Sequence, residues 1–297
     1  MRGYTERTKK LRQQSVSTQP RVSLERAILE TEFYKENEGK YEIPVMRGLN
    51  LLNYMSKRKL YIGEGELIVG EKSEGPQVVP TYPEICAHTV EDMDIMDSRK
   101  LVSFKVKPED KITQKEMILP YWEGKATRDR LLQQVPQRWK DSYYAGMFTE
   151  FMEQRGPGHT VADGKMYEKG FIEFKKELED QIASLDFEHD LDAYDKRAQL
   201  QGMVYSCDAI MVLGKRYAEY ARELAAKEAD PKRKEELLWI AGNCYVVPAH
   251  KPETFAQCLQ MYWFVHLCVT TETNTWDSFS PGKLDQYIYP FYKKEKE

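Results

Sequence analysis

One long segment, from Asp192 to Lys227, limits the fold more than any other feature of this sequence. It contains no proline, and the dipeptide Asp230-Pro231 follows it closely. Proline is tolerated in the first turn of a helix but not in its interior. The segment therefore predicts one very long helix that ends before Pro231, and a chain that is mostly helical.

The rest of the sequence predicts shorter elements on both sides of this helix. They are a helix capped by Ser23, a helix with Pro44 in its first turn, a short strand or extended segment at 67–69, a helix opened by Pro83, an alternating strand at 102–106, an amphipathic helix at 167–185, a helix ending at Cys244 and a buried helix at 254–269. The polar stretch that follows, from Thr270, is expected to be extended. The predicted fold class is mainly α with short strands.

Charge and cysteine usage narrow the functional classes. The chain has 297 residues, with 44 Lys and Arg against 48 Asp and Glu, a net charge of −4 that argues against a nucleic-acid-binding protein. No segment approaches the roughly 20 apolar residues of a membrane span. The five cysteines are scattered without a C-x-x-C pair, and no signal-peptide pattern is present. We therefore expect a cytoplasmic protein with reduced thiols, no disulfides and no metal site.

Two residues stand out as candidates for chemistry. Gly156-Pro157-Gly158 cannot continue a helix, so it places His159 in a loop, where an imidazole can donate or accept a proton near neutral pH. Asp277 follows Trp276 in the polar C-terminal stretch and is a second candidate. A loop histidine without a role, and an aspartate that only forms a turn, remain alternatives at this point.

Other chemical motifs are weaker. The spacing of Gly63, Gly65 and Gly70 fits neither a dinucleotide-binding fingerprint nor a P-loop. His266 lies on an apolar helix and is expected to be a core histidine. His250 lies between two prolines and is expected to brace a joint, whereas His88 and His189 have no neighbouring ligand pattern.

Several longer motifs resemble one known family. They are Gly65-Glu-Leu-Ile-Val-Gly70, Pro80-Thr-Tyr-Pro-Glu84, Phe148-Thr-Glu-Phe-Met-Glu-Gln-Arg155, Arg155-Gly-Pro-Gly-His-Thr160, Leu213-Gly-Lys-Arg-Tyr-Ala218, Pro248-Ala-His-Lys-Pro-Glu-Thr254, Gln260-Met-Tyr-Trp-Phe-Val-His266 and the region from Thr270 to Gln286. Together they resemble the N-terminal part of a glycyl radical enzyme of the pyruvate formate-lyase superfamily. Within it they are most similar to the dehydratases that act on trans-4-hydroxy-L-proline.

The resemblance implies a fold and an incomplete reaction centre. Residues 1–297 would be the N-terminal helical portion of a single domain, a ten-stranded α/β barrel, with the first barrel strand near residues 268–277. Neither the thiyl-forming cysteine of the family nor its C-terminal glycyl radical loop is found in this sequence. We therefore expect a fragment that binds no cofactor and is inactive alone.

The resemblance also implies the chemistry of the parent enzyme. An activating enzyme that uses S-adenosylmethionine and an iron–sulfur cluster would install the glycyl radical, and water would be eliminated from trans-4-hydroxy-L-proline by a homodimer. His159 and Asp277 match residues that contact the leaving hydroxyl, and Phe151 matches one that packs on the substrate ring. A glycerol, propanediol, choline or formate acetyltransferase type of enzyme, or a non-catalytic helical binding module, remain the alternatives.

Overall fold

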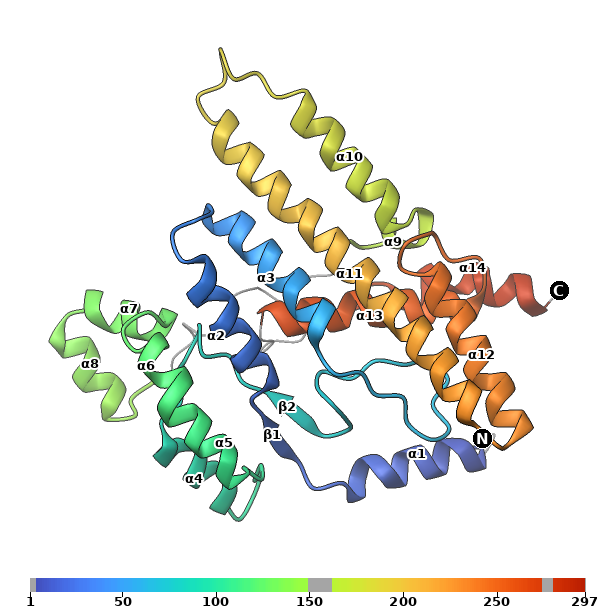
Figure 1. Ribbon diagram of the computed structural model, residues 1–297, viewed down its shortest axis with the longest axis horizontal. Coiled ribbons are helices and arrows are strands. Elements are labelled where there is room, and N and C mark those ends of the chain that lie inside the picture. Colours follow the sequence, from blue (N-terminus) through green and yellow to red (C-terminus); the bar gives the residue numbers. More distant parts are fainter. Residues whose placement is uncertain (1–3, 149–161, 274–279, 297) are drawn as a thin grey trace.

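The computed structural model describes residues 4–148, 162–273 and 280–296, and these are mostly helical (Figure 1). In chain order the elements are α1 (Glu6–Ser17), β1 (Arg21–Ser23), α2 (Glu25–Asn37), α3 (Ile43–Lys57), β2 (Val78–Pro80), α4 (Val90–Ser98), α5 (Pro108–Thr113), a π-helical turn (Gln114–Ile118), α6 (Leu119–Trp122), α7 (Thr127–Gln134), α8 (Gln137–Tyr144), α9 (Lys165–Glu168), α10 (Phe171–Ala183), α11 (Ala193–Lys227), α12 (Pro231–Val246), α13 (Phe255–Thr273) and α14 (Leu284–Lys296). The predicted fold class, mainly α with short strands, is confirmed.

The long helix predicted from the sequence is α11, which has 35 residues and so extends over about 52 Å. In Figure 1, α10 runs antiparallel beside its first half, and α12 packs beside its second half. α3 crosses α11 where Gly48 faces Gly202, so that the two backbones are in contact. A Cβ on Gly202 would overlap the carbonyl oxygen of Pro44. This crossing therefore depends on glycine.

The main hydrophobic core lies between α3, α11, α12 and α13. Its fully buried members include Met55, Leu213, Tyr217, Ile240 and Phe264. α13 is apolar on several sides, as the sequence predicted, and every one of its residues is buried or half-buried. Other parts of the chain therefore pack against α13 on most of its sides.

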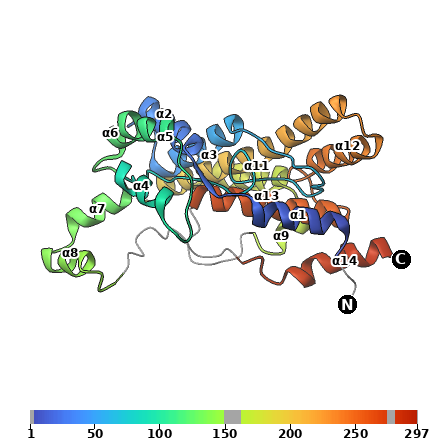
Figure 2. The ribbon, with the colours of Figure 1, turned by 90° about the horizontal axis from the view of Figure 1, so that it is seen from below.

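A second, smaller core joins the N-terminal segments. Strands β1 and β2 are parallel, with Val22 paired to Val79, and Val22 packs with residues of α2, α4 and α6. The helices from α4 to α8 lie at one end of the molecule, and α14 lies at the other (Figure 2).

Two of the family motifs contact each other: the one at 260–266, which lies on α13, and the one at 65–70. The Gln260 side chain both accepts from the Val69 N–H at 2.9 Å and donates to the Val69 carbonyl at 2.8 Å. The Trp263 indole N–H donates to the Gly70 carbonyl at 2.8 Å. Residues 67–69 form no strand. The backbone N–H and carbonyl of Val69, which would pair with a neighbouring strand, bond to the Gln260 side chain instead.

Three local predictions in the N-terminal half were wrong. The alternating segment 102–106 is not a strand, because Leu101 and Val102 are exposed, Val102 has a φ of +53°, and only Lys105 forms a β-bridge, to Arg21. Pro83 lies in a buried turn rather than at the start of a helix. Ser23 ends β1, and α2 begins at Glu25, although the Ser23 hydroxyl does accept from the Glu25 N–H at 3.2 Å.

The predicted first barrel strand near 268–277 also needs correction. Residues 268–273 continue α13 as helix, and the remainder lies outside the described residues. Leu267, Cys268 and Thr271 extend the buried face of the helix, and the structure places no strand beside them among the ranges it describes. A strand needs such a neighbour for its hydrogen bonds, whereas a helix satisfies its own.

Across the described ranges, none of the helices is long and apolar enough to cross a membrane.

Candidate functional site

The three predicted site residues lie outside the described part of the chain. Phe151 and His159 belong to 149–161, and Asp277 belongs to 274–279. Their mutual geometry therefore remains a prediction. The structure does describe Ala162 and Thr273, the residues that border these two segments.

Ala162 and Thr273 line the same groove, which lies between α10, α11 and α13. Its volume is about 610 Å³, within the range of small-molecule sites. Its walls are mostly apolar and are formed by Phe171, Phe174, Leu178, Met203, Cys207, Ile210, Val265 and Val269. We call it the α10–α11–α13 groove. The segments that contain His159 and Asp277 thus meet the described structure at one groove, although 111 positions separate Ala162 from Thr273 in sequence (273 − 162).

Three charged residues that line this groove, Lys169, Glu177 and Glu272, are each in an ion pair. Lys169 bonds to Glu177 at 2.5 Å, and the Arg47 guanidinium donates to Glu272 through Nε at 2.9 Å and through a terminal nitrogen at 2.6 Å. Burial lowers the pKa of Arg47, but Glu272, helped by Tyr34 and Glu84, raises it by more, so Arg47 stays charged. The Arg47–Glu272 pair ties α3 to the last turn of α13.

Beneath that turn lies a buried cluster of charges. Arg26 is 3% exposed and contacts two buried carboxylates, Glu30 and Glu84. Burial lowers the pKa of the Arg26 guanidinium, but the two carboxylates raise it well above its usual value. Burial also raises the pKa of the Glu30 carboxyl, and Arg26 offsets only part of that shift. The cluster therefore holds a charged guanidinium next to the end of α13.

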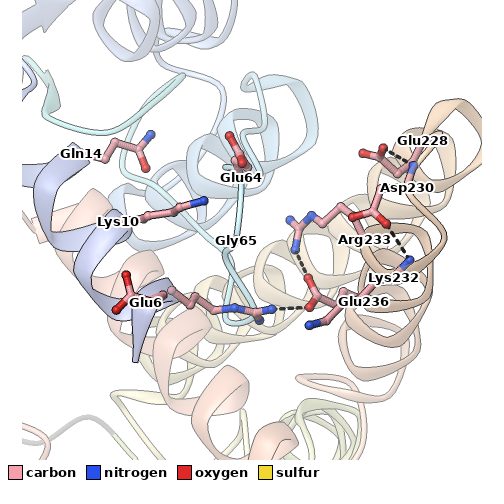
Figure 3. A pocket seen from close by; sticks show the side chains of 11 residues that line it. Glu6, Lys10, Gln14, Glu64, Gly65, Glu228, Asp230, Lys232, Arg233 and Glu236 are labelled. Carbon is pink, nitrogen blue, oxygen red and sulfur yellow. Dashed lines mark hydrogen bonds and ion pairs between the residues drawn. The ribbon is translucent and has the colours of Figure 1, made fainter. Parts of the chain in front are cut away.

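A larger groove, of about 950 Å³, lies between α1, the 63–66 loop and the start of α12 (Figure 3). Arg7 of α1 bonds to Glu236 of α12 across it, and Arg233, one turn before Glu236 on α12, bonds to the same carboxylate. Arg233 also donates to the carbonyl groups of Gly63 and Glu66 at 2.9 Å. Burial raises the pKa of Glu236, but the two arginines lower it by more. These charges brace α12 against α1.

One glycine N–H of the same loop is already bonded within the loop. The Gly63 N–H donates to the Glu66 carboxylate at 2.8 Å, so it is not available to an anion. This agrees with the mismatch in glycine spacing noted in the sequence.

The histidines and cysteines of the described ranges offer no metal site. No group of three or more His, Cys, Asp or Glu side chains in these ranges is arranged to hold a metal ion. His266 stacks on Trp263 with ring centroids 5.6 Å apart, and burial together with Lys72 lowers its pKa; it is half-buried, at the edge of the core rather than inside it. His250 is exposed. All five cysteines are buried and none of them forms a disulfide, and burial raises the pKa of Cys207 to about 11.

Residues 4–297 match the family described as pyruvate formate lyase-like. The chain belongs to this family. This pyruvate formate lyase-like chain is 53% identical over 296 residues to a trans-4-hydroxy-L-proline dehydratase from Clostridioides difficile, covering 100% of this chain and 38% of that protein. The crystal structure of hydroxyproline dehydratase from the same organism, with trans-4-hydroxy-L-proline bound, superposes with a TM-score of 0.95 over 99% of this chain and 37% of the other. A B12-independent glycerol dehydratase from Clostridium butyricum gives a TM-score of 0.91 at 30% identity, covering 98% and 37%.

These comparisons confirm the family predicted from the sequence motifs. The pyruvate formate lyase-like chain corresponds to the N-terminal part of a larger glycyl radical enzyme, and it spans about 38% of the length of the curated relative. The fold seen here superposes on 37% of each of these two solved chains.

Sequence reasoning missed the residues that fix the end of α13. The motif Pro80–Glu84 was noted for its resemblance alone, yet it supplies Tyr82 and Glu84 to the cluster around Arg26. A charged residue inside the buried face of a predicted helix, as Arg26 is in α2, was the available signal.

Proposed function

We propose that this chain supplies the N-terminal part of a glycyl radical enzyme that eliminates water from trans-4-hydroxy-L-proline. Residues 1–297 would belong to one pyruvate formate-lyase-type domain. The observation that carries the proposal is the 53% identity with a trans-4-hydroxy-L-proline dehydratase over the whole of this chain. The groove lined by Ala162 and Thr273, the described residues next to the two candidate segments, supports it independently.

In this proposal, His159 and Asp277 act on the hydroxyl that leaves. Hydroxide is a poor leaving group, so a proton delivered as the carbon–oxygen bond breaks lets it depart as water. A positioned imidazolium contributes roughly 10²–10⁴-fold to such a step. A neighbouring carboxylate favours the protonated imidazole and fixes its orientation. Phe151 would pack on the substrate ring.

The hydrogen-abstracting chemistry comes from outside the residues described here. When it is installed by its activating enzyme, the glycyl radical supplies the oxidising equivalent for hydrogen removal. The residues of this chain would bind and orient the substrate and hold the proton for the leaving group. A homodimer is the assembly we propose for the complete enzyme.

The test uses the complete gene product under anaerobic conditions, with an activating enzyme, S-adenosylmethionine, a reductant and trans-4-hydroxy-L-proline. We expect pyrroline carboxylate to form. His159→Ala and Asp277→Ala should each lower kcat by about 10²–10⁴-fold while leaving the organic radical signal intact. His250→Ala, a change at an exposed histidine elsewhere, serves as the control and should leave kcat unchanged.

Three outcomes would contradict the proposal. Turnover of glycerol or propanediol in place of hydroxyproline would assign another substrate. A chain that turns over no substrate, although its activating enzyme works on a relative, would favour a binding module. Full activity of both alanine variants would remove His159 and Asp277 from the reaction.

A further inference from the structure

A small cavity lies where α2, α3 and α13 meet, beside the buried charges around Arg26. Its volume is about 10 Å³, and all of its lining residues belong to the described ranges, among them Glu30 of α2, Asn50 of α3, and Thr271 and Glu272 of α13. A buried water molecule needs about 10–15 Å³ of such space. The cavity therefore has room for one water molecule.

Three buried oxygen atoms of these lining residues make no hydrogen bond. Within the described ranges, no donor or acceptor is bonded to Asn50 Oδ1 or to Thr271 Oγ1. Glu30 Oε2 forms an ion pair with an Arg26 nitrogen at 2.5 Å but makes no hydrogen bond. Asn50, Thr271 and Glu30 are only 4%, 0% and 3% exposed, so bulk solvent does not reach them. Buried polar atoms without a partner are costly and rare, so these three oxygens call for one.

The orientation of the Asn50 amide is fixed by its other end. Its Nδ2 donates to Glu30 Oε1 at 3.0 Å, and an Arg26 nitrogen donates to the same oxygen at 3.2 Å. Turning the amide over would place the Asn50 oxygen against Glu30 Oε1, which is itself an acceptor, and would lose this bond. The Asn50 oxygen is therefore left on the side of the amide that has no partner.

We propose that one structural water occupies this cavity and joins α2, α3 and α13. It donates to Asn50 Oδ1 and Glu30 Oε2 and accepts from the Thr271 hydroxyl, and three hydrogen bonds are usual for a buried water. Because water both donates and accepts, it also serves Glu30 when that carboxyl holds a proton, a state that burial favours by raising its pKa. The inference does not rest on the proposed function.

The cavity has a route to solvent through Glu272. This residue lines both the cavity and the α10–α11–α13 groove, and its side chain is 17% exposed. The cavity therefore borders the groove at Glu272, and the water can exchange with solvent there.

A crystal structure of the complete gene product tests the site directly. We expect one density peak at roughly 2.7–3.2 Å from Asn50 Oδ1, Glu30 Oε2 and Thr271 Oγ1. A cavity without a peak, or an Asn50 amide turned over to accept a proton from Glu30, would overturn the proposal. A peak with oxygen neighbours at about 2.3–2.6 Å would mean a bound cation such as Ca²⁺ and would overturn it as well.

Thr271→Val replaces the hydroxyl by a methyl group of similar size, and the sign of its effect depends on the water. If the hydroxyl bonds to a water, its removal should lower the melting temperature by about 2–4 °C. A buried hydroxyl without a partner is itself a cost, so its removal would raise the melting temperature. We expect the fall, and a rise would overturn the proposal.

Thr270→Val is the matched control, one residue earlier on the same helix. Thr270 is 3% exposed, its hydroxyl donates to the Leu267 carbonyl at 3.2 Å, and it does not line the cavity. Crystals of Thr270→Val should keep the water peak unchanged. Thr271→Val leaves the water with two partners and should weaken the peak. Equal peaks in the two variants would overturn the bridge between the three helices.

Discussion

The Glu71 carboxyl shows how one residue can make the stability of this chain depend on pH. Burial and the nearby Glu66 raise its pKa to about 7, with Arg58 opposing. An unfolded glutamate titrates near 4.3. Between these two values the folded state binds more protons than the unfolded state, so the free energy of unfolding falls as the pH rises. The Glu71 contribution is fully present below about pH 4.3 and is lost by about pH 7.

We therefore expect Glu71→Gln to remove this loss. Its melting temperature relative to wild type should rise between pH 5 and 7 and stay constant above that window, as measured by calorimetry in matched buffers. Glu64→Gln, at an exposed position in the same loop, is the control and should follow the wild-type profile. A constant difference between Glu71→Gln and wild type across pH 5 to 8 would contradict the assignment.

At the residue scale, the sequence could predict which side chains are candidates for proton transfer, but not which distant residues contact each other. The Gly-Pro-Gly turn before His159 signals a loop residue, because backbone preferences act locally. Apart from Glu30, one turn along the same helix, the partners of Arg26 are 55 to 245 positions away, at Thr81, Glu84 and Thr271, and local patterns carry no information about these three. The contact between Arg26 and the Thr271 carbonyl of α13 could therefore be found only from the structure.

The contact between α3 and α11 determines how these two helices can pack. Gly202→Ala should destabilise the chain by about 1–3 kcal/mol, because the added Cβ overlaps the Pro44 carbonyl oxygen and forces the helices apart. Gly242→Ala is the matched control, a helical glycine of α12 with nothing within 4 Å of its Cβ position. It should stabilise the chain by about 0.5–1 kcal/mol.

Chemical denaturation of the three proteins measures both changes. The opposite signs are the essential result, since the two substitutions share the same intrinsic helix preference. Stabilisation by both alanines would mean that α3 and α11 are not in backbone contact at Gly202.

At the element scale, long helices were predicted well and short extended segments poorly. The lengths of α11 and α12 follow from proline positions and apolar spacing, which act within one element, whereas α13 continues to Thr273, beyond its predicted end at residue 269. Strands β1 and β2 were missed, and 102–106 was wrongly predicted as a strand. A strand exists only where a partner lies beside it, and β1 pairs with a segment more than 50 positions away.

For the whole molecule, the α10–α11–α13 groove exposes apolar surface in the isolated chain. We expect the chain to bind a hydrophobic dye and to self-associate, as measured by fluorescence and by size-exclusion chromatography with light scattering. Met203→Glu should reduce both, because Met203 lines the groove. Leu238→Glu is the control, since Leu238 on α12 is equally exposed, at 51%, and lies outside the groove.

Two results would oppose this expectation. A monomer that binds no dye would show that the groove is covered. Equal effects of Met203→Glu and Leu238→Glu would show that the association does not involve the groove.

The turn between α10 and α11 lies at the far tip of their hairpin, away from the end of α13 (Figure 1). There Asp186 accepts from the N–H groups of Glu188 and His189, and the Leu191 side chain is fully exposed. Exposed loop tips tolerate inserted peptides better than any other part of a domain. An affinity tag or a fluorophore placed at this turn would therefore let the protein be purified or followed without touching the groove.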